Sequence, residues 1–286
     1  MGGAMITSRP HSRLIGHFLL VLGLIVVVFP IYYVFVASTH SLETILKPPL
    51  PLLPGGDFIA NYREALYGGI GRIGGVGVGT LLLNTTIMAL GIALGKIVIS
   101  IMSAYAIVFF RFPLRLVFFW IIFITLMLPI EVRILPTYKV MVDLNLIDTY
   151  AGLIVPLIAS ATATLRFRQF FMTVPNELIE AARIDGAGPW RFFKDILLPL
   201  SRTNIAALFV ILFIYGWTQY LWPLLVTNSN SMNTIVIALR KMISFADADT
   251  QWHLVMVTCV LAILPPVLVV VLMQRWFVRG LVESEK

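Results

Sequence analysis

One stretch decides how the whole chain is interpreted: Val174-Pro175-Asn176-Glu177-Leu178-Ile179-Glu180-Ala181-Ala182-Arg183-Ile184-Asp185-Gly186. Proline suits the first turn of a helix and glycine suits the position just after its end, so Pro175 and Gly186 mark the limits of a short helix. Glu177 lies near its start and Arg183 near its end, which is the order that the helix dipole favours. The stretch therefore predicts one short helix with a sharp stop.

The predicted helix carries one stripe along its length, made of Leu178, Ala181, Ala182 and Asp185. The two alanines keep this surface shallow. A second amphipathic helix is predicted to start at Pro189, and its apolar face consists of Phe192, Phe193, Ile196, Leu197 and Leu200. The pattern predicts a helix–break–helix knob whose surface is shaped to enter a partner. The alternative, an ordinary solvated loop, rarely carries two such helices.

The composition of the chain around this knob is that of a membrane protein. Of its 286 residues, 59% are hydrophobic and 12% are charged, against about 25% charged in an average soluble domain. So little charge cannot cover the outside of a soluble core of this size. A soluble enzyme domain and a disordered regulator are both poor fits, and a single cysteine excludes a disulfide scaffold.

Six apolar stretches are long enough to cross a bilayer as helices, which takes about 20 residues each. They are residues 14–36, 81–109, 115–136, 150–171, 204–226 and 254–275. The prediction is an all-α polytopic membrane protein with one transmembrane domain over residues 14–275. The knob belongs to a loop at residues 172–202 between the fourth and fifth spans. Residues 1–13 and 276–286 are the terminal segments.

The basic residues give the orientation. With six spans, both termini and the 172–202 loop share one face, and that face holds 13 of the 21 Lys and Arg residues. The opposite face holds seven, and Lys96 lies within a span. Because cytoplasmic loops are enriched in Lys and Arg, we expect a bacterial cytoplasmic membrane protein with both termini in the cytoplasm. The formal charge of +7 is then a topology signal and does not indicate nucleic-acid binding.

No motif for covalent chemistry stands out, so we expect a protein that is not an enzyme and binds no metal or cofactor itself. Residues 69–74 match GxGxxG, but they precede a membrane helix and lack the βαβ context of a nucleotide site. GxxxxGK[ST], HExxH and GxSxG patterns are all missing from the sequence. Gly91 and Gly95 form a GxxxG in the second span, which predicts close helix packing within the chain or against a partner subunit.

Three charged residues in or near the spans are candidates for a polar solute path. Lys96 lies near the centre of the second span, where a lysine needs a partner or a watery cavity. Glu131 and Arg133 lie at the end of the third span. Arg133 suits an anionic solute because guanidinium binds phosphate and carboxylate well. The alternatives are a structural partner for Lys96 and a local Glu131–Arg133 ion pair.

The knob also carries a known motif. The knob resembles the EAA loop of ABC importer permeases at every motif position. These positions are Glu180-Ala181-Ala182, then Gly186 after three residues, Ile196 after nine more, and Leu198-Pro199 after one more. The six-span layout is similar to the second permease subunit of carbohydrate-type (MalG-like) importers. Five further segments resemble the permeases of sn-glycerol-3-phosphate importers: Phe110–Arg115, Leu128–Pro136, Ala161–Met172, Tyr215–Pro223 and Gln274–Lys286.

The resemblance implies a type I ABC importer permease (MetI-like) fold with a cytoplasmic EAA coupling loop. It implies four kinds of partner besides the lipid bilayer: a second permease subunit, two ATPase subunits that hydrolyse ATP, an extracytoplasmic solute-binding protein, and the solute. The residues implied to couple the permease to the ATPase are Glu177, Glu180, Ala181, Ala182, Asp185, Gly186, Ile196, Leu198 and Pro199. The implied solute is sn-glycerol 3-phosphate or a glycerophosphodiester.

Three other interpretations stay open. The same class of importer could carry a different carbohydrate such as a disaccharide. A stand-alone secondary transporter would need its own coupling-ion site, and the spans show one lysine but no acidic relay. A membrane-embedded enzyme would need a catalytic cluster, and none is visible.

Overall fold

A computed structural model describes residues 10–125, 130–243 and 250–283 of the chain. This part is helical and contains no β-strand; its one β-bridge joins Ile70 to Val76. The all-α prediction is therefore confirmed for the described residues.

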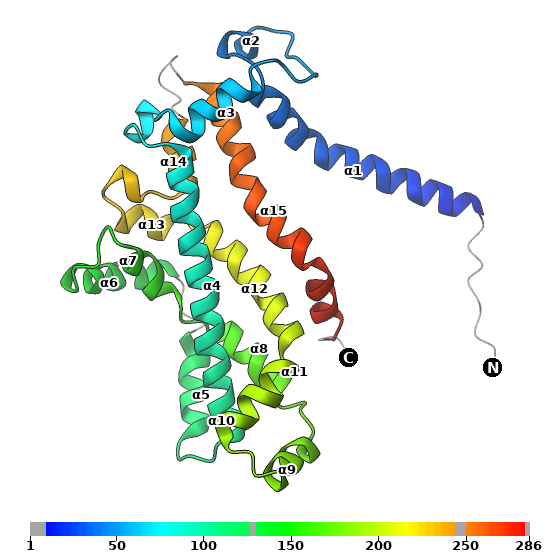
Figure 1. Cartoon of the computed structure of the whole chain (residues 1–286), viewed down its shortest axis with the longest axis vertical. Coiled ribbons are helices and arrows are strands. Elements are labelled where there is room, and N and C mark those ends of the chain that lie inside the picture. The colour runs from blue at the N-terminus through cyan, green and yellow to red at the C-terminus, as the bar shows by residue number, and fades with distance from the viewer. Residues whose placement is uncertain (1–9, 126–129, 244–249, 284–286) are drawn as a thin grey trace.

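Four long helices build the framework: α1 (Pro10–Ser38), α4 (Val78–Phe109), α12 (Arg202–Trp217) and α15 (Trp252–Glu283). Helix α4 is central and packs against α12 and against α8 (Ala161–Phe171), while α15 packs against both α12 and α1 (Figure 1). One end of this framework carries α9 (Asn176–Ile184), and the opposite end carries α3 (Phe58–Tyr67). We refer to them as the α9 end and the α3 end.

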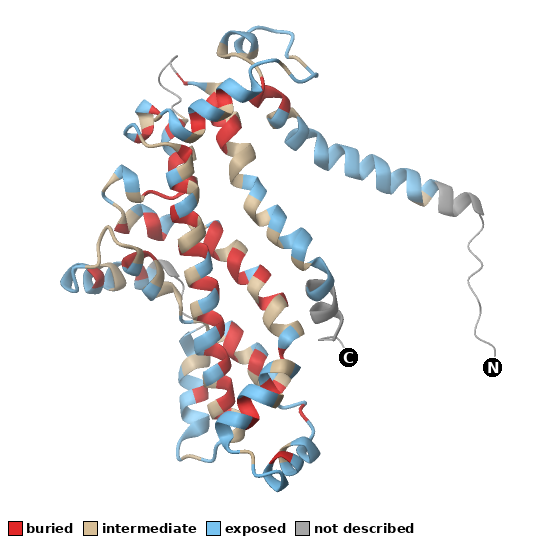
Figure 2. Cartoon of the chain, in the orientation of Figure 1, coloured by how far each residue is buried: buried red, intermediate tan, exposed pale blue. Residues whose placement is uncertain are grey.

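Among the described residues, three helices are long and apolar enough to cross a membrane alone: Ile15–Ser38, Val78–Phe109 and Trp252–Trp276. They correspond to the first, second and sixth predicted spans. The first is 6% buried over its most apolar window and extends away from the bundle (Figures 1 and 2). Such an apolar surface needs lipid or another protein to cover it.

The fourth predicted span is a bent pair of helices. It consists of α7 (Tyr150–Ile154), the short helix η3 (Val155–Leu157) and α8, with a bend of 49° between the two parts. Ser160 starts α8 by accepting a hydrogen bond from the backbone N–H of Ala163 at 3.3 Å. A serine cap defines a helix start, so it makes the break a defined joint.

The fifth predicted span starts within two residues of α12 but ends later than α12 does. A first segment, α10 (Pro189–Phe192), η4 (Phe193–Leu197) and α11 (Leu198–Leu200), meets α12 at a bend of 71°. Helix α12 then ends at Trp217, and α13 (Leu221–Val226) is separate. The prediction of one helix over 204–226 is wrong because Pro223 belongs to the first turn of a new helix, where its missing N–H costs nothing.

The region of the third predicted span holds α5 (Arg115–Ile124) and α6 (Ile130–Asp143). Residues 126–129 between them lie outside the described residues. At 1.5 Å per residue, the ten residues of α5 extend about 15 Å, half of the hydrocarbon thickness. With the two bent pairs counted as one span each, the described residues contain up to five spans, so six spans stay a prediction.

Two tryptophans hydrogen-bond to carbonyl groups that prolines leave free. A proline has no N–H for the carbonyl four residues earlier. Pro266 leaves the Ala262 carbonyl of α15 free, and the indole N–H of Trp217 donates to it at 3.1 Å. Pro156 leaves the Gly152 carbonyl free in the same way, and Trp222 donates to it at 3.1 Å. Neighbouring helices thus satisfy these buried groups, as membrane packing requires.

Glycines set the closest helix contacts. A Cβ at Gly91 or Gly95 would come within 2.6 or 2.5 Å of isoleucine side chains at positions 154 and 158. The GxxxG of α4 therefore packs against the bent fourth span of the same chain. A Cβ at Gly216 of α12 would come within 2.9 Å of the Ala89 Cα in α4. The backbones of α4 and α12 approach closely at this point because Gly216 has no side chain.

Short helices close the α3 end: α2 (Leu42–Leu46), α3, η1 (Gly71–Ile73), η5 (Asn230–Met232) and α14 (Ile235–Met242). Asn84 of α4 is 2% exposed and joins α4 to η5, to the segment before α14 and to α7, because its amide donates to the carbonyls of Ser231 and Asn233 and accepts from the Tyr150 hydroxyl. Nearby, the Asp148 carboxylate accepts the backbone N–H groups of Asn228 and Ser229 at 3.1 Å each.

Candidate functional site

The predicted sharp stop at Gly186 is confirmed. Gly186 has φ +71°, a conformation that glycine adopts without cost. The N–H of Ala187 donates to the Ala182 carbonyl at 2.8 Å, and the N–H of Gly186 donates to the Arg183 carbonyl at 3.1 Å. These two bonds form a Schellman motif, which satisfies carbonyls left free at a helix end. Pro175 lies one residue before α9, in extended conformation, and is not part of the first turn.

Most of the predicted coupling residues of α9 are exposed. These are Glu177, Glu180, Ala181, Asp185 and Gly186. Ala182 is an exception, because it is only 4% exposed and packs against the chain's own core. The prediction that it shares the presented stripe is therefore wrong. Two apolar side chains extend the exposed surface instead, Leu178 at 39% and Ile184 at 86% exposure.

An aromatic cluster supports the base of α9. It consists of Tyr105, Phe109, Phe171, Phe192 and Phe193, with ring centroids 5.0–5.8 Å apart in successive contacts. The Tyr105 hydroxyl also donates to the Pro189 carbonyl at 2.7 Å. A cavity of about 530 Å³ lies beside this cluster and is lined by Ala182 and Ala187 among others. The loop is thus attached to the bundle through α10, while α9 projects beyond it.

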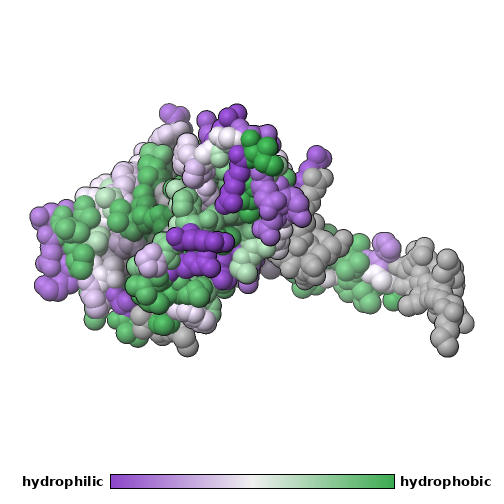
Figure 3. Space-filling view, turned by 90° about the horizontal axis from the view of Figure 1, so that it is seen from below, coloured by the Kyte–Doolittle hydropathy of each residue, from purple (hydrophilic) through white to green (hydrophobic). Residues whose placement is uncertain are grey.

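The view onto this end shows hydrophilic and hydrophobic side chains mixed on one face (Figure 3). The exposed side chains of α9 include the apolar Leu178 and Ile184 as well as acidic and basic groups. The geometry of α9 therefore fits the predicted knob.

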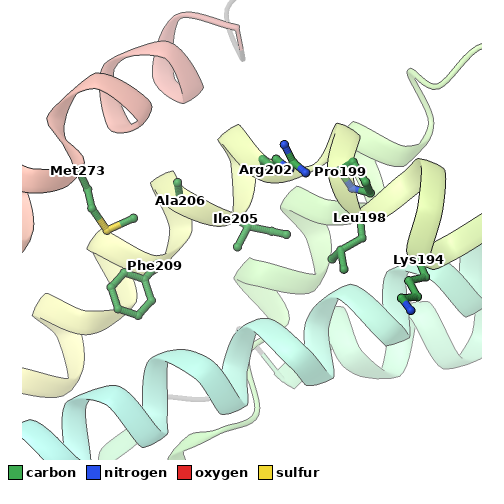
Figure 4. A pocket seen from close by; sticks show the side chains of 8 residues that line it. All are labelled: Lys194, Leu198, Pro199, Arg202, Ile205, Ala206, Phe209 and Met273. Atoms are coloured by element: carbon green, nitrogen blue, oxygen red, sulfur yellow. The ribbon is translucent and has the colours of Figure 1, made fainter.

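The remaining motif residues lie away from α9. Ile196 is half-buried in η4, whereas Leu198 and Pro199 line a separate groove of about 590 Å³ between α11, α12 and α15. Figure 4 shows Phe209 and Met273 near one end of this groove and Lys194 at the other. The structure therefore divides the motif into an exposed tip on α9 and a base at the 71° bend.

Lys96 lies in α4 and is 6% exposed. Its ammonium lies 3.7 Å from the centroid of the Tyr215 ring in α12. A cation over an aromatic face gains about 0.5–2 kcal/mol, whereas a lysine at the bilayer centre costs about 2.5–3.5 kcal/mol on insertion scales. The ring alone does not offset the burial. No ion pair of the described residues includes Lys96.

Arg133 is the second cation of this region. It is exposed on α6, and its charge interacts with both Lys96 and Tyr215. It also lines a small cavity of about 90 Å³ with Gln219 and Trp222. Arg133 thus lies within electrostatic range of Lys96, and Gln219 links its cavity to Tyr215, the residue over which Lys96 lies. The side chain of Glu131 lies outside the described residues, so its predicted pairing with Arg133 is untested.

Sequence reasoning missed Tyr215 as the partner of Lys96 and Tyr105 as the anchor of the loop. Neither has a local signal, because each contact joins helices that are distant in the sequence. The one available hint was Gly216, a small residue beside Tyr215 at a position where helices pack closely.

Comparison with known proteins identifies the class. Residues 96–283 match the family of binding-protein-dependent transport system inner membrane components, and the chain belongs to this family. The structure is similar to the crystal structure of a bacterial ABC transporter involved in the import of the acidic polysaccharide alginate. The TM-score is 0.79 at 23% sequence identity, covering 94% of this chain and 99% of the other. The expected MetI-like fold of ABC importer permeases is confirmed.

Individual relatives match over their whole length. The sn-glycerol-3-phosphate transport system permease protein UgpE of Rhizobium meliloti (strain 1021) is 71% identical over 99% of this chain and 100% of its own. The proteins of the same name from Brucella melitensis and Yersinia pestis are 69% and 56% identical over the same shares. The chain is thus a membrane permease subunit of the ABC importer class.

Proposed function

We propose that the chain is one of two permease subunits of an ATP-driven importer for sn-glycerol 3-phosphate and glycerophosphodiesters. The full-length similarity to the UgpE proteins carries the choice of solute. The choice of mechanism rests on α9, which projects beyond the bundle and exposes Glu177, Glu180 and Ala181 where a partner can reach them.

In this mechanism two ATPase subunits bind below the α9 end and hydrolyse ATP, and this chain holds no nucleotide itself. The exposed tip, formed by Glu177, Glu180, Ala181, Asp185 and Gly186, inserts into a cleft of one ATPase. Closure of the ATPase dimer then displaces the loop. The displacement passes through α10–η4–α11 to α12, which changes the bundle from inward-facing to outward-facing.

The two parts of the motif have different roles in this proposal. Ala182 is the spacer that lets α9 lie against the bundle, and its small side chain supports the tip from within. Ile196, Leu198 and Pro199 belong to the bend where the loop meets α12, so they transmit the displacement without touching the ATPase.

The α9 end faces the cytoplasm in our proposal, and so do both termini. The face assigned to the cytoplasm carries 13 of the 21 Lys and Arg residues, in agreement with the positive-inside rule. A solute-binding protein then delivers the solute at the α3 end, in the extracytoplasmic space of a bacterial inner membrane. The second permease subunit completes the path beside Lys96, Glu131 and Arg133, which are the proposed path residues of this chain.

Uptake by the complete importer tests this function. The complex of both permeases and two ATPases is reconstituted in proteoliposomes with the binding protein outside and ATP inside. We expect uptake of labelled sn-glycerol 3-phosphate that unlabelled glycerophosphodiesters reduce and disaccharides leave unchanged. If only a disaccharide competes, the transported solute is a different carbohydrate. Uptake without ATPase subunits would indicate a secondary transporter.

A further inference from the structure

Lys96 and Arg133 form a pair of cations that the protein itself leaves without a counter-charge in its described part. Lys96 is buried, and its ammonium lies over the face of the Tyr215 ring, 3.7 Å from the ring centroid. Arg133 takes part in none of the ion pairs among the described residues. Their charges interact with each other, and like charges repel strongly where water is scarce.

The surroundings hold Lys96 at this place. Gly216 lets α12 approach the backbone of α4 at Ala89, which brings the neighbouring Tyr215 onto the same side as Lys96. The Gln219 amide donates to the Tyr215 carbonyl at 3.1 Å and so fixes the last turn of α12. The aromatic face therefore orients the ammonium, and Tyr215 is a positioning residue.

The space beside Arg133 can accept a small polar group. The cavity of about 90 Å³ is lined by Arg133 and Thr137 of α6, by Gln219 in the link between α12 and α13, and by Trp222 of α13. The Trp222 indole N–H already donates to the Gly152 carbonyl, and the Thr137 hydroxyl donates to the Arg133 carbonyl at 2.7 Å. Arg133 is the cation among the lining residues, and Lys96 adjoins them through Tyr215, whose carbonyl accepts from the Gln219 amide.

We propose that Lys96 and Arg133 together bind the phosphate group of the solute during its passage, and that the pair favours a phosphomonoester dianion over a phosphodiester monoanion or an uncharged sugar. The inference rests on the proposed function. An anion between two cations removes their repulsion and gains charge-assisted hydrogen bonds from both. Two positive charges match two negative ones, so the preference for the dianion follows from charge alone.

Direct binding tests this site separately from transport. The purified four-subunit complex in nanodiscs, without binding protein, is titrated with labelled sn-glycerol 3-phosphate and with a labelled glycerophosphodiester. We expect saturable binding of the monoester, weakened at least about tenfold by Lys96→Met and by Arg133→Gln. Lys139→Gln is the matched control, because Lys139 lies on the same helix, is exposed and pairs with Asp143 at 3.6 Å.

One further variant and two further measurements distinguish a loss of charge from a loss of folding. Lys96→Arg keeps the charge and should restore most of the binding, whereas complex assembly and basal ATP hydrolysis report on folding of every variant. The double variant should bind less than tenfold more weakly than the weaker-binding single variant. The two effects should not add fully, because both cations hold one phosphate.

Unchanged affinity in both single variants would overturn the site, and so would an equal affinity for monoester and diester. Absence of saturable binding to the wild-type complex counts against it as well. Failure of the wild-type importer to take up the monoester with binding protein and ATP present would instead refute the proposed function.

Discussion

The turn at Gly186 permits a prediction that separates backbone strain from steric contact. Gly186 has φ +71°, and a Cβ built at this position meets nothing within 4 Å. Substitution therefore adds only the cost of the left-handed conformation, about 1–2 kcal/mol for an ordinary L-residue. Asparagine adopts this conformation more readily than other residues, and a β-branched residue adopts it least readily. We expect the order Gly, Asn, Ala, Val from most to least stable turn.

A loss of about 1–2 kcal/mol corresponds to roughly a 5- to 30-fold smaller ratio of closed to open turn. Hydrogen exchange of the Ala187 amide, which donates to the Ala182 carbonyl, reports this ratio directly. Uptake by the reconstituted importer and ATP hydrolysis stimulated by the binding protein report its consequence. We expect both activities to fall along the same order, with Gly186→Asn close to wild type and Gly186→Val strongly impaired.

Asparagine and valine are similar in size, so a simple clash of the new side chain with the ATPase would impair both equally. Equal activities of Gly186→Asn and Gly186→Val would therefore refute the reasoning from backbone conformation. Full activity of Gly186→Val with faster exchange would show that the turn is dispensable for coupling.

Three further predictions concern stability, measured by thermal unfolding of the purified complex. Trp217→Phe removes the hydrogen bond to the carbonyl that Pro266 leaves free, so it should cost about 1–3 kcal/mol, and less when Pro266→Ala restores the helix's own donor. Gly216→Ala should separate α4 from α12 and cost about 1–3 kcal/mol, whereas Gly23→Ala, with open space around its Cβ, should be neutral. Partial burial raises the pKa of Asp148, but its hydrogen bonds from two backbone N–H groups and the Ser229 side chain outweigh this, and the net pKa is lowered. The carboxylate then stabilises the fold above its unfolded pKa of about 3.9, so the deficit of Asp148→Asn at pH 7 should shrink as the pH falls below about 4.

Features that depend on neighbouring residues in the sequence were predictable. The end of α9 at Gly186 follows from a glycine placed where the Schellman motif needs it, and the hydrogen bonds of this motif span only a few residues. The long apolar helices α1, α4 and α15 follow from hydropathy in the same local way. The burial of Ala182 could not be predicted, because it depends on the core that distant helices form in the folded chain.

Features that depend on contacts between distant helices were not predictable. Hydropathy does not register a bend, so the 49° bend within the fourth predicted span and the early end of α12 at Trp217 were missed. The GxxxG at Gly91 and Gly95 indicated close packing, but small residues permit a neighbour without selecting it. Lys96 was recognisable as a candidate from its charge alone, whereas Tyr215 and Arg133 became its neighbours only in the folded chain.

The central claim is that the exposed tip of α9 couples ATP hydrolysis to transport. Uptake of labelled sn-glycerol 3-phosphate by the reconstituted importer carrying Glu180→Lys tests it most directly. Asp143→Lys, an exposed charge reversal on α6, serves as the control. We expect Glu180→Lys to abolish uptake in a correctly assembled complex that keeps its basal ATP hydrolysis, and Asp143→Lys to transport normally. Undiminished uptake by the Glu180→Lys importer would contradict the coupling role of α9.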